Sequence, residues 1–311
     1  MSNIYKNNKN ILEDSLVPFT LQDTSIRGRS VRLNRSIRTI LSKHNYPPKV
    51  SYLLSEALIL NCLVGQTIKM RWKLSFQVRG TGAIKLISTD YKSPTKINAS
   101  AKIRGFASFD SSGIKNTKLS GIRNLGKGFF AIIIDQGRGS EPYKGITEFK
   151  GESLSNCAEH YFEQSEQLPT FFKIIVRQDH NFKLDSNFVG GGIMIQYIPK
   201  DSLIEQNEYW NRAKIFLNTV DDRELLNYEV SQEELLYRLF HQQDLKLMEY
   251  QKIVFGCSCS SIKVKKTLSI YSLRELETMV NEAGYVTADC QFCGQHYSFK
   301  PENLKKRGSK F

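Results

Sequence analysis

Alternating apolar and polar residues dominate the first two hundred positions of the chain, and this period is typical of half-buried β-strands. In the clearest run, Trp72, Leu74, Phe76 and Val78 are separated by lysine, serine and glutamine. The turn Gly80-Thr81-Gly82 follows, so we expect a hairpin whose second strand covers 83–91. Further strands are predicted over 97–109, 129–134, 170–178 and 191–198.

Helical periodicity marks two segments of the same region. Apolar residues recur three and four positions apart from Val50 to Cys62, and a second helix that contains Cys157 begins after Ser153. Both cysteines are expected to be buried core residues, since a free cysteine behaves as a small hydrophobe. Strands together with a few helices predict an α+β fold, with a mainly antiparallel-sheet core domain over residues 1–199.

Seven basic residues and no acidic residue lie between positions 27 and 49. Arg32, Arg35 and Arg38 recur every three positions, which predicts the solvated face of an amphipathic helix. A phosphate-binding surface is the alternative interpretation, because clustered arginines neutralise phosphates.

Strand patterning disappears over residues 200–252, where short helices are predicted at 204–220, 221–226 and 231–243. The last of them opens with the capping box Ser231-x-x-Glu234. This segment is acidic and rich in large apolar side chains. Short helices are marginally stable alone in water, so we expect a metastable helical linker that depends on its neighbours for stability.

Four of the six cysteines lie in the tail, residues 253–311, as the pairs Cys257-x-Cys259 and Cys290-x-x-Cys293. Paired cysteines with this spacing predict a site in which four thiolates hold one zinc ion. A helix opened by the capping box Ser272-x-x-Glu275 and strands over 285–288 and 296–299 complete the predicted zinc-binding domain. His296 is an alternative ligand, although four cysteines already complete a tetrahedral set.

The formal net charge of +13 first suggests nucleic acid as a partner, but the positive charge lies mainly in the core domain and the tail. The amino-terminal stretch is polar and basic and has no apolar run of a signal peptide. The apolar stretch 50–64 is too short for a membrane span. Clustered cysteines then indicate metal or redox chemistry in the cytoplasm, where thiols stay reduced.

Several motifs, taken in order, resemble those of the heat-shock protein 33 family, the redox-regulated 33-kDa chaperonins. The most specific are the two cysteine pairs with thirty residues between Cys259 and Cys290. The resemblance covers about Val17 to Leu304. Supporting motifs are Arg27-Gly28 with Val31-Arg-Leu33, Tyr46-Pro-Pro48, Gly151-Glu-Ser-Leu154, Ser165-Glu-Gln-Leu-Pro-Thr170, Gly191-Gly192 and Leu235-Leu-Tyr-Arg-Leu-Phe-His241.

The resemblance implies an ATP-independent holdase, not an enzyme, that protects unfolding proteins from aggregation during oxidative stress. In the reduced state, Cys257, Cys259, Cys290 and Cys293 would hold one zinc ion. Oxidation would form the disulfides Cys257–Cys259 and Cys290–Cys293, release zinc and unfold the linker, and a homodimer is implied when oxidised. Freed linker side chains would then bind unfolded clients: Tyr209, Trp210, Ile215, Phe216, Leu217, Leu236, Leu239 and Phe240.

Two other classes of protein compete with this interpretation. A zinc-ribbon nucleic-acid-binding protein would use the basic residues and bind with a steep dependence on salt, although we consider a nucleic-acid partner the weaker hypothesis. A thiol oxidoreductase would use Cys290 and Cys293, but the βαβ context that such a motif requires is missing from the sequence.

Overall fold

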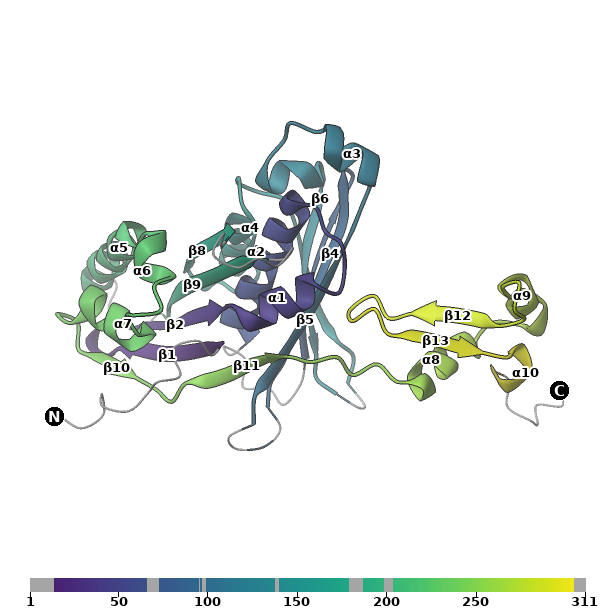
Figure 1. Ribbon diagram of the computed structural model, residues 1–311. Helices are drawn as coiled ribbons and strands as arrows, with labels where there is room; N and C mark the ends of the chain where they lie inside the picture. The colour runs from purple at the N-terminus through teal and green to yellow at the C-terminus, as the bar shows by residue number, and fades with distance from the viewer. Residues whose placement is uncertain are drawn as a thin grey trace. The chain divides into compact units, whose positions relative to one another are not determined.

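The computed structural model describes residues 14–65, 73–94, 96, 99–137, 140–178, 187–198 and 204–304, without the side chains of residues 23 and 204–207 (Figure 1). The first residues of two predicted strands, Trp72 and Ile97, lie outside this set. Contacts divide the chain into two compact units, Met1–Phe255 and Gly256–Phe311.

A large mixed sheet organises the first unit, and its strands run in the order β7-β6-β3-β4-β5-β11-β1-β2-β9-β8, with β10 also paired to β1. Their bounds are β1 Ser15–Leu21, β2 Ile26–Leu33, β3 Lys73–Gly80, β4 Ile84–Lys92, β5 Ala101–Phe109, β6 Gly128–Asp135, β7 Tyr143–Glu148, β8 Thr170–Gln178, β9 Phe188–Tyr197, β10 Leu245–Leu247 and β11 Gln251–Phe255. The expected hairpin is present, because Leu74 of β3 pairs with Tyr91 of β4. The α+β class is confirmed.

Helices of the first unit lie on both faces of the sheet. They are α1 Arg35–Leu41, α2 Pro48–Gly65, α3 Ser111–Asn116, α4 Leu154–Ser165, α5 Ile204–Thr219, α6 Asp222–Leu225 and α7 Gln232–Phe240, together with the 3₁₀ turns η1 Gln22–Thr24 and η2 Gly121–Leu125. The apolar helix α2 is the centre of the main core, where it contacts β4 and β5 as well as β8 and β9 (Figure 1). As expected, Cys62 and Cys157 are fully buried in this core.

Consecutive glycines in β9 let helices approach it from both sides. A Cβ atom at Gly190 would lie 2.5 Å from Ile59 Cδ1 of α2. At Gly191, whose Cβ would point to the other face, it would lie 3.2 Å from Leu225 Cγ of α6. Larger residues would therefore push α2 or the linker helices away from the sheet.

The linker helices α5 to α7 pack on the face of the sheet that is opposite α2 (Figure 1). Their buried residues, such as Leu217, Leu236 and Phe240, form a second apolar cluster with Phe19 of β1 and Ile193 of β9. The rings of Phe19 and Phe240 stack with centroids 5.6 Å apart. Each helix therefore gains its stability from packing on the sheet, because helices this short are marginally stable alone in water.

Two local predictions are wrong. The arginine run is not one helix with a solvated face, because residues 26–33 form β2, in which Arg29 and Arg32 are both only 6% exposed. Helix α1 begins only at Arg35. Residues 253–255 belong to β11 of the large sheet rather than to the tail, since Ile253 pairs with Ala101 of β5. The division of the chain into a core domain, a metastable linker and a zinc-binding domain stays a prediction.

Candidate metal centre

The first cysteine pair lies in the loop between β11 and helix α8, Ser261–Leu268, of the second unit. Ser260 caps this helix, because its side chain accepts a hydrogen bond from the Lys263 amide. The cap places the helix start directly after Cys259 and limits the conformations of the loop that carries both thiols. The sequence pattern had not predicted α8.

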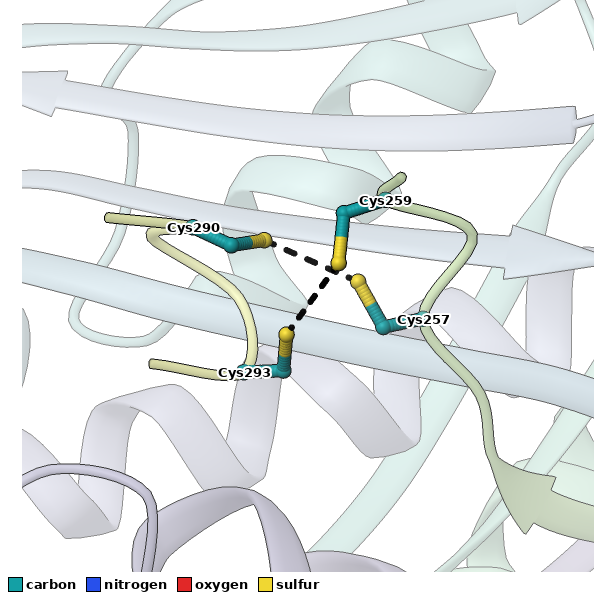
Figure 2. Close-up of side chains that lie close together, drawn as sticks. All are labelled: Cys257, Cys259, Cys290 and Cys293. Carbon is teal, nitrogen blue, oxygen red and sulfur yellow. Dashed lines mark hydrogen bonds between the residues drawn. The ribbon is translucent and has the colours of Figure 1, made fainter. Parts of the chain in front are cut away.

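The second pair lies in the turn of a hairpin formed by β12, Val286–Asp289, and β13, His296–Phe299. The Cys290 amide donates to the Gln295 carbonyl at 3.0 Å, and the Gly294 amide donates to the Cys290 carbonyl at 2.8 Å. Gly294 has a φ of 69°, a conformation that favours glycine. From this tight turn, the side chains of Cys290 and Cys293 both point toward the thiols of the first pair (Figure 2).

The four thiols converge on one point (Figure 2). All four sulfur atoms lie within 4.8 Å of one another, with 3.7 Å between Cys257 and Cys290 and 3.4 Å between Cys259 and Cys293. A tetrahedron with Zn–S bonds of about 2.3 Å has edges of about 3.8 Å, so the spacing fits a zinc ion. Among the described residues, this is the one group of three or more histidine, cysteine or carboxylate side chains that could hold a metal ion.

Thiol chemistry at this site depends on a cation. None of the four cysteines is in a disulfide bond. Burial, together with the neighbouring thiols of Cys259, Cys290 and Cys257, raises the pKa of Cys293 to about 12. Burial also raises the pKa of Cys290. A divalent cation has the opposite effect because it stabilises thiolates, and this soft four-sulfur donor set suits zinc.

Two polar side chains of β13, Tyr297 and His296, lie close to the second cysteine pair in the sequence and differ in their contacts. Tyr297 Oη donates a hydrogen bond to Cys259 Sγ at 3.1 Å, a contact that sequence reasoning missed because 38 residues separate the partners. His296 Nδ1 lies 2.7 Å from Asp289 Oδ1, and His296 is not a member of the sulfur group. The site is therefore built from four thiols with one phenol beside them.

The unit that carries the site has a very small core. Its apolar cluster contains three buried side chains, Leu276, Val286 and Leu304. The remaining elements are α9, Leu273–Thr278, which has the predicted Ser272–Glu275 capping box, and α10, Pro301–Leu304. A unit of this size buries too little apolar surface to be stable by packing alone, so a metal would supply much of its folding free energy.

A family model described as "Hsp33 protein" matches residues 14–300. The chain belongs to the Hsp33 family. The 33 kDa chaperonin of Caulobacter vibrioides (strain NA1000 / CB15N) is 32% identical over 297 residues, which cover 94% of this chain and 96% of the relative. The 33 kDa chaperonin of Proteus mirabilis (strain HI4320) is 30% identical over 295 residues, with 94% and 95% covered.

The fold agrees with this family assignment. The crystal structure of a 33 kDa chaperonin (heat shock protein 33 homolog) from Thermotoga maritima superposes with a TM-score of 0.77, at 21% identity, and the match covers 93% of this chain and 96% of that chain. At this identity the likeness establishes the Hsp33 fold alone. The name that the relatives share supports a chaperone function.

In this Hsp33 fold, most of the side chains predicted to bind clients are turned toward the sheet. Leu217, Leu236 and Phe240 are fully buried, and Tyr209, Trp210, Phe216 and Leu239 are partly buried in the same cluster. Ile215 lies apart, with 62% of its surface exposed. Their role in binding clients stays a prediction.

Sequence reasoning also missed the polar contacts that attach the linker to the core of this Hsp33 chain. The Arg32 guanidinium of β2 donates to the carbonyl oxygens of Asn227, Val230 and Glu224. Burial lowers the pKa of Arg32 to about 10, so the buried side chain remains a cation at neutral pH. The side chain therefore satisfies backbone groups of the linker and is unavailable to a phosphate surface.

None of the described helices combines the length and apolar character that a membrane crossing requires.

Proposed function

We propose that this protein is an ATP-independent holdase that oxidation switches on. In the reduced state, Cys257, Cys259, Cys290 and Cys293 would bind one zinc ion as thiolates. The observation that carries the proposal is the convergence of these four sulfur atoms in a unit whose described residues, 256–304, include only three buried apolar side chains. Loss of the metal would remove most of the stability of such a unit.

The chemistry of the switch balances with peroxide as oxidant. Two thiolates and one hydrogen peroxide take up two protons and give one disulfide and two water molecules. Two such reactions convert the four thiolates into two disulfides, which no longer provide the thiolate ligands that zinc requires. The proposed pairing is Cys257 with Cys259 and Cys290 with Cys293.

The linker is the element that would respond. Helices α5 to α7 bury their apolar side chains on the sheet, so their release would expose Trp210, Phe216 and Leu239 to unfolding clients. Exposed apolar surface of this kind binds other exposed apolar surface without ATP. Cytoplasmic location and a homodimer in the oxidised state are part of the same proposal.

Light scattering by a heat-unfolding client protein tests this function. Peroxide-treated protein should suppress aggregation, reduced protein should not, and a chromophoric chelator should report one zinc released per chain. The variants Cys62→Ala and Cys157→Ala are matched controls, because both residues are buried cysteines outside the cluster and should leave the switch intact. Oxidation that releases zinc without any gain in holdase activity would contradict the proposal.

Tryptic mapping of the oxidised protein tests the pairing separately. Cleavage after Lys252 and Lys263 leaves Cys257 and Cys259 on one peptide, and cleavage after Arg274 separates it from the peptide with Cys290 and Cys293. The proposed pairing predicts two disulfides, each within one peptide. Cross-linked peptides would instead indicate pairing of Cys257 with Cys290 and Cys259 with Cys293, whose sulfur atoms already lie 3.7 Å and 3.4 Å apart.

A further inference from the structure

Strand β11 fills a slot in the middle of the large sheet. One edge of β11 pairs antiparallel with β1, where Lys252 lies opposite Ser15. The other edge pairs parallel with β5, where residues 253–255 lie opposite 101–103. The Ile253 amide also donates to the Asp14 carbonyl at 2.8 Å. The slot therefore offers backbone hydrogen bonds to an extended segment on both of its sides.

The segment 245–255 covers one whole edge of β1. Strand β10 pairs with residues 19–21, the Met248 amide donates to the Pro18 carbonyl at 2.9 Å, and β11 pairs with residues 15 and 16. We name the segment 245–255 the edge cover. Without it, β1 would expose the row of unpaired amides and carbonyls that makes a free edge strand pair with another chain.

The side chains of the edge cover are less buried than those of β1, the strand that it covers. Within β10 and β11, Ile253 is the one buried residue, and between them Met248 and Tyr250 are exposed. In β1, by contrast, Leu16, Val17, Phe19 and Leu21 are almost completely buried in the two apolar clusters. The edge cover can therefore detach at a smaller cost than β1 itself.

The position of the edge cover in the chain links it to both parts that oxidation would unfold. It begins five residues after the end of α7 at Phe240, and it ends two residues before Cys257. If the second unit and the linker lose their folds, neither end of the edge cover is attached to a folded neighbour. Its remaining attachments would then be the strand ladder, the buried Ile253, the partly buried Leu245, Leu247 and Phe255, and the hydrogen bond from Gln251 Nε2 to the Ala99 carbonyl.

We propose, resting on the function above, that the edge cover is autoinhibitory and that the slot between β1 and β5 binds extended segments of unfolding clients as added strands. The present occupant indicates the chemistry that fits: an extended backbone without proline, with a β-branched or aromatic side chain at the position of Ile253. A cavity of about 110 Å³ beside this strand is lined by Arg35, Ser36 and Thr39. It leaves room for side chains larger than isoleucine, as a binder of varied clients needs.

A labelled peptide with the sequence of residues 245–255 tests this site on the full-length protein by fluorescence anisotropy. We expect oxidised protein to bind the peptide at least tenfold more tightly than reduced protein. An Ile253→Pro peptide, which lacks the amide that bonds the Asp14 carbonyl, should bind at least tenfold more weakly. Excess unlabelled peptide should restore client aggregation in the presence of oxidised protein.

A pair of chain variants tests the autoinhibition. Ile253→Ala should loosen the edge cover, so that reduced protein binds the peptide several-fold more tightly, whereas Lys246→Ala, at an exposed position of the same segment, should have no effect. The peptide experiment needs no variant and stands even if Ile253→Ala fails to fold.

The outcomes separate this inference from the proposed function. Oxidised protein that does not suppress aggregation refutes the function itself. Oxidised protein that holds clients, but binds the wild-type and proline peptides equally, refutes the slot. If the peptide blocks only self-association in size-exclusion chromatography and leaves client binding unchanged, the slot accepts a second copy of this chain, and the client site is refuted.

Discussion

Replacement of Gln232 by methionine should release the linker from the core without oxidation. Gln232 lies at the start of α7 and is only 5% exposed. Its Oε1 accepts from Ser30 Oγ of β2 at 2.8 Å, and its Nε2 donates to Ser15 Oγ of β1 at 2.9 Å. These contacts join the linker helix to the two strands on which it packs.

The magnitude follows from the hydrogen bonds. Methionine has nearly the same shape as glutamine, so the packing is preserved while both bonds are lost. The Ser30 hydroxyl is fully buried and loses its partner. A lost hydrogen bond costs about 1 kcal/mol, and an unsatisfied buried group adds about 1 kcal/mol or more. We therefore expect the substitution to lower the free energy of opening of α7 by about 2 to 3 kcal/mol. The opening constant of α7 should rise about 30- to 150-fold.

Amide hydrogen exchange on reduced, zinc-loaded protein measures this opening directly. Protection of residues 235–240 should fall by that factor, while β4 and β5 retain theirs. Gln242→Met is the matched control, because Gln242 is an exposed glutamine of the same segment and should leave the exchange unchanged.

A double-mutant cycle decides whether the Ser30 contact is the cause. Ser30→Ala combined with Gln232→Met removes both partners, so the pair should cost less than the sum of the single variants. Additive costs, or an unchanged exchange rate of residues 235–240 in Gln232→Met, would refute the reasoning.

Three further outcomes are expected. Cys259→Ser should lower zinc occupancy and loosen the second unit under reducing conditions, and full occupancy by metal analysis would count against Cys259 as a ligand. Tyr297→Phe removes the hydrogen bond to Cys259 Sγ, so peroxide-dependent zinc release should accelerate up to about tenfold, with Tyr285→Phe as control, and an unchanged rate would refute a role for the phenol. Burial raises the pKa of Glu56 from 4.5 to about 7, so the folded state binds its proton more tightly than the unfolded state and stability should fall as pH rises through this range. Between pH 5 and pH 8, Glu56→Gln should abolish about 2 to 3 kcal/mol of that fall in denaturant titrations, and equal slopes in both proteins would exclude Glu56 as its source.

Local chemistry explains where sequence reasoning succeeded. The Ser272–Glu275 capping box forms between residues three positions apart, and both of its hydrogen bonds are present in α9. The β3–β4 hairpin is equally local, because one short turn determines its register. The tight turn that holds Cys290 and Cys293 is likewise confined to a few residues.

Sequence reasoning failed where the outcome depends on contacts with distant strands and helices. Residues 26–33 form a strand in which Arg27 and Arg29 lie on one face and Arg32 on the other. The period of three over Arg32, Arg35 and Arg38 concealed the change from strand to helix at Asn34. Burial of Arg32 became evident only from the carbonyl oxygens that receive its guanidinium, which lie about 195 positions away in the sequence.

The sequence by itself determined the zinc-type donor set, the acidic linker with its large apolar side chains and the family motifs, because these depend on residue identity and short spacing. Tertiary structure alone decided that Tyr297 lies beside Cys259 and that β11 belongs to the core sheet. Periodicity shows that a segment is a strand but not which strands will pair with it. That choice depends on contacts between distant residues, and here it places the segment before Cys257 in the centre of the fold.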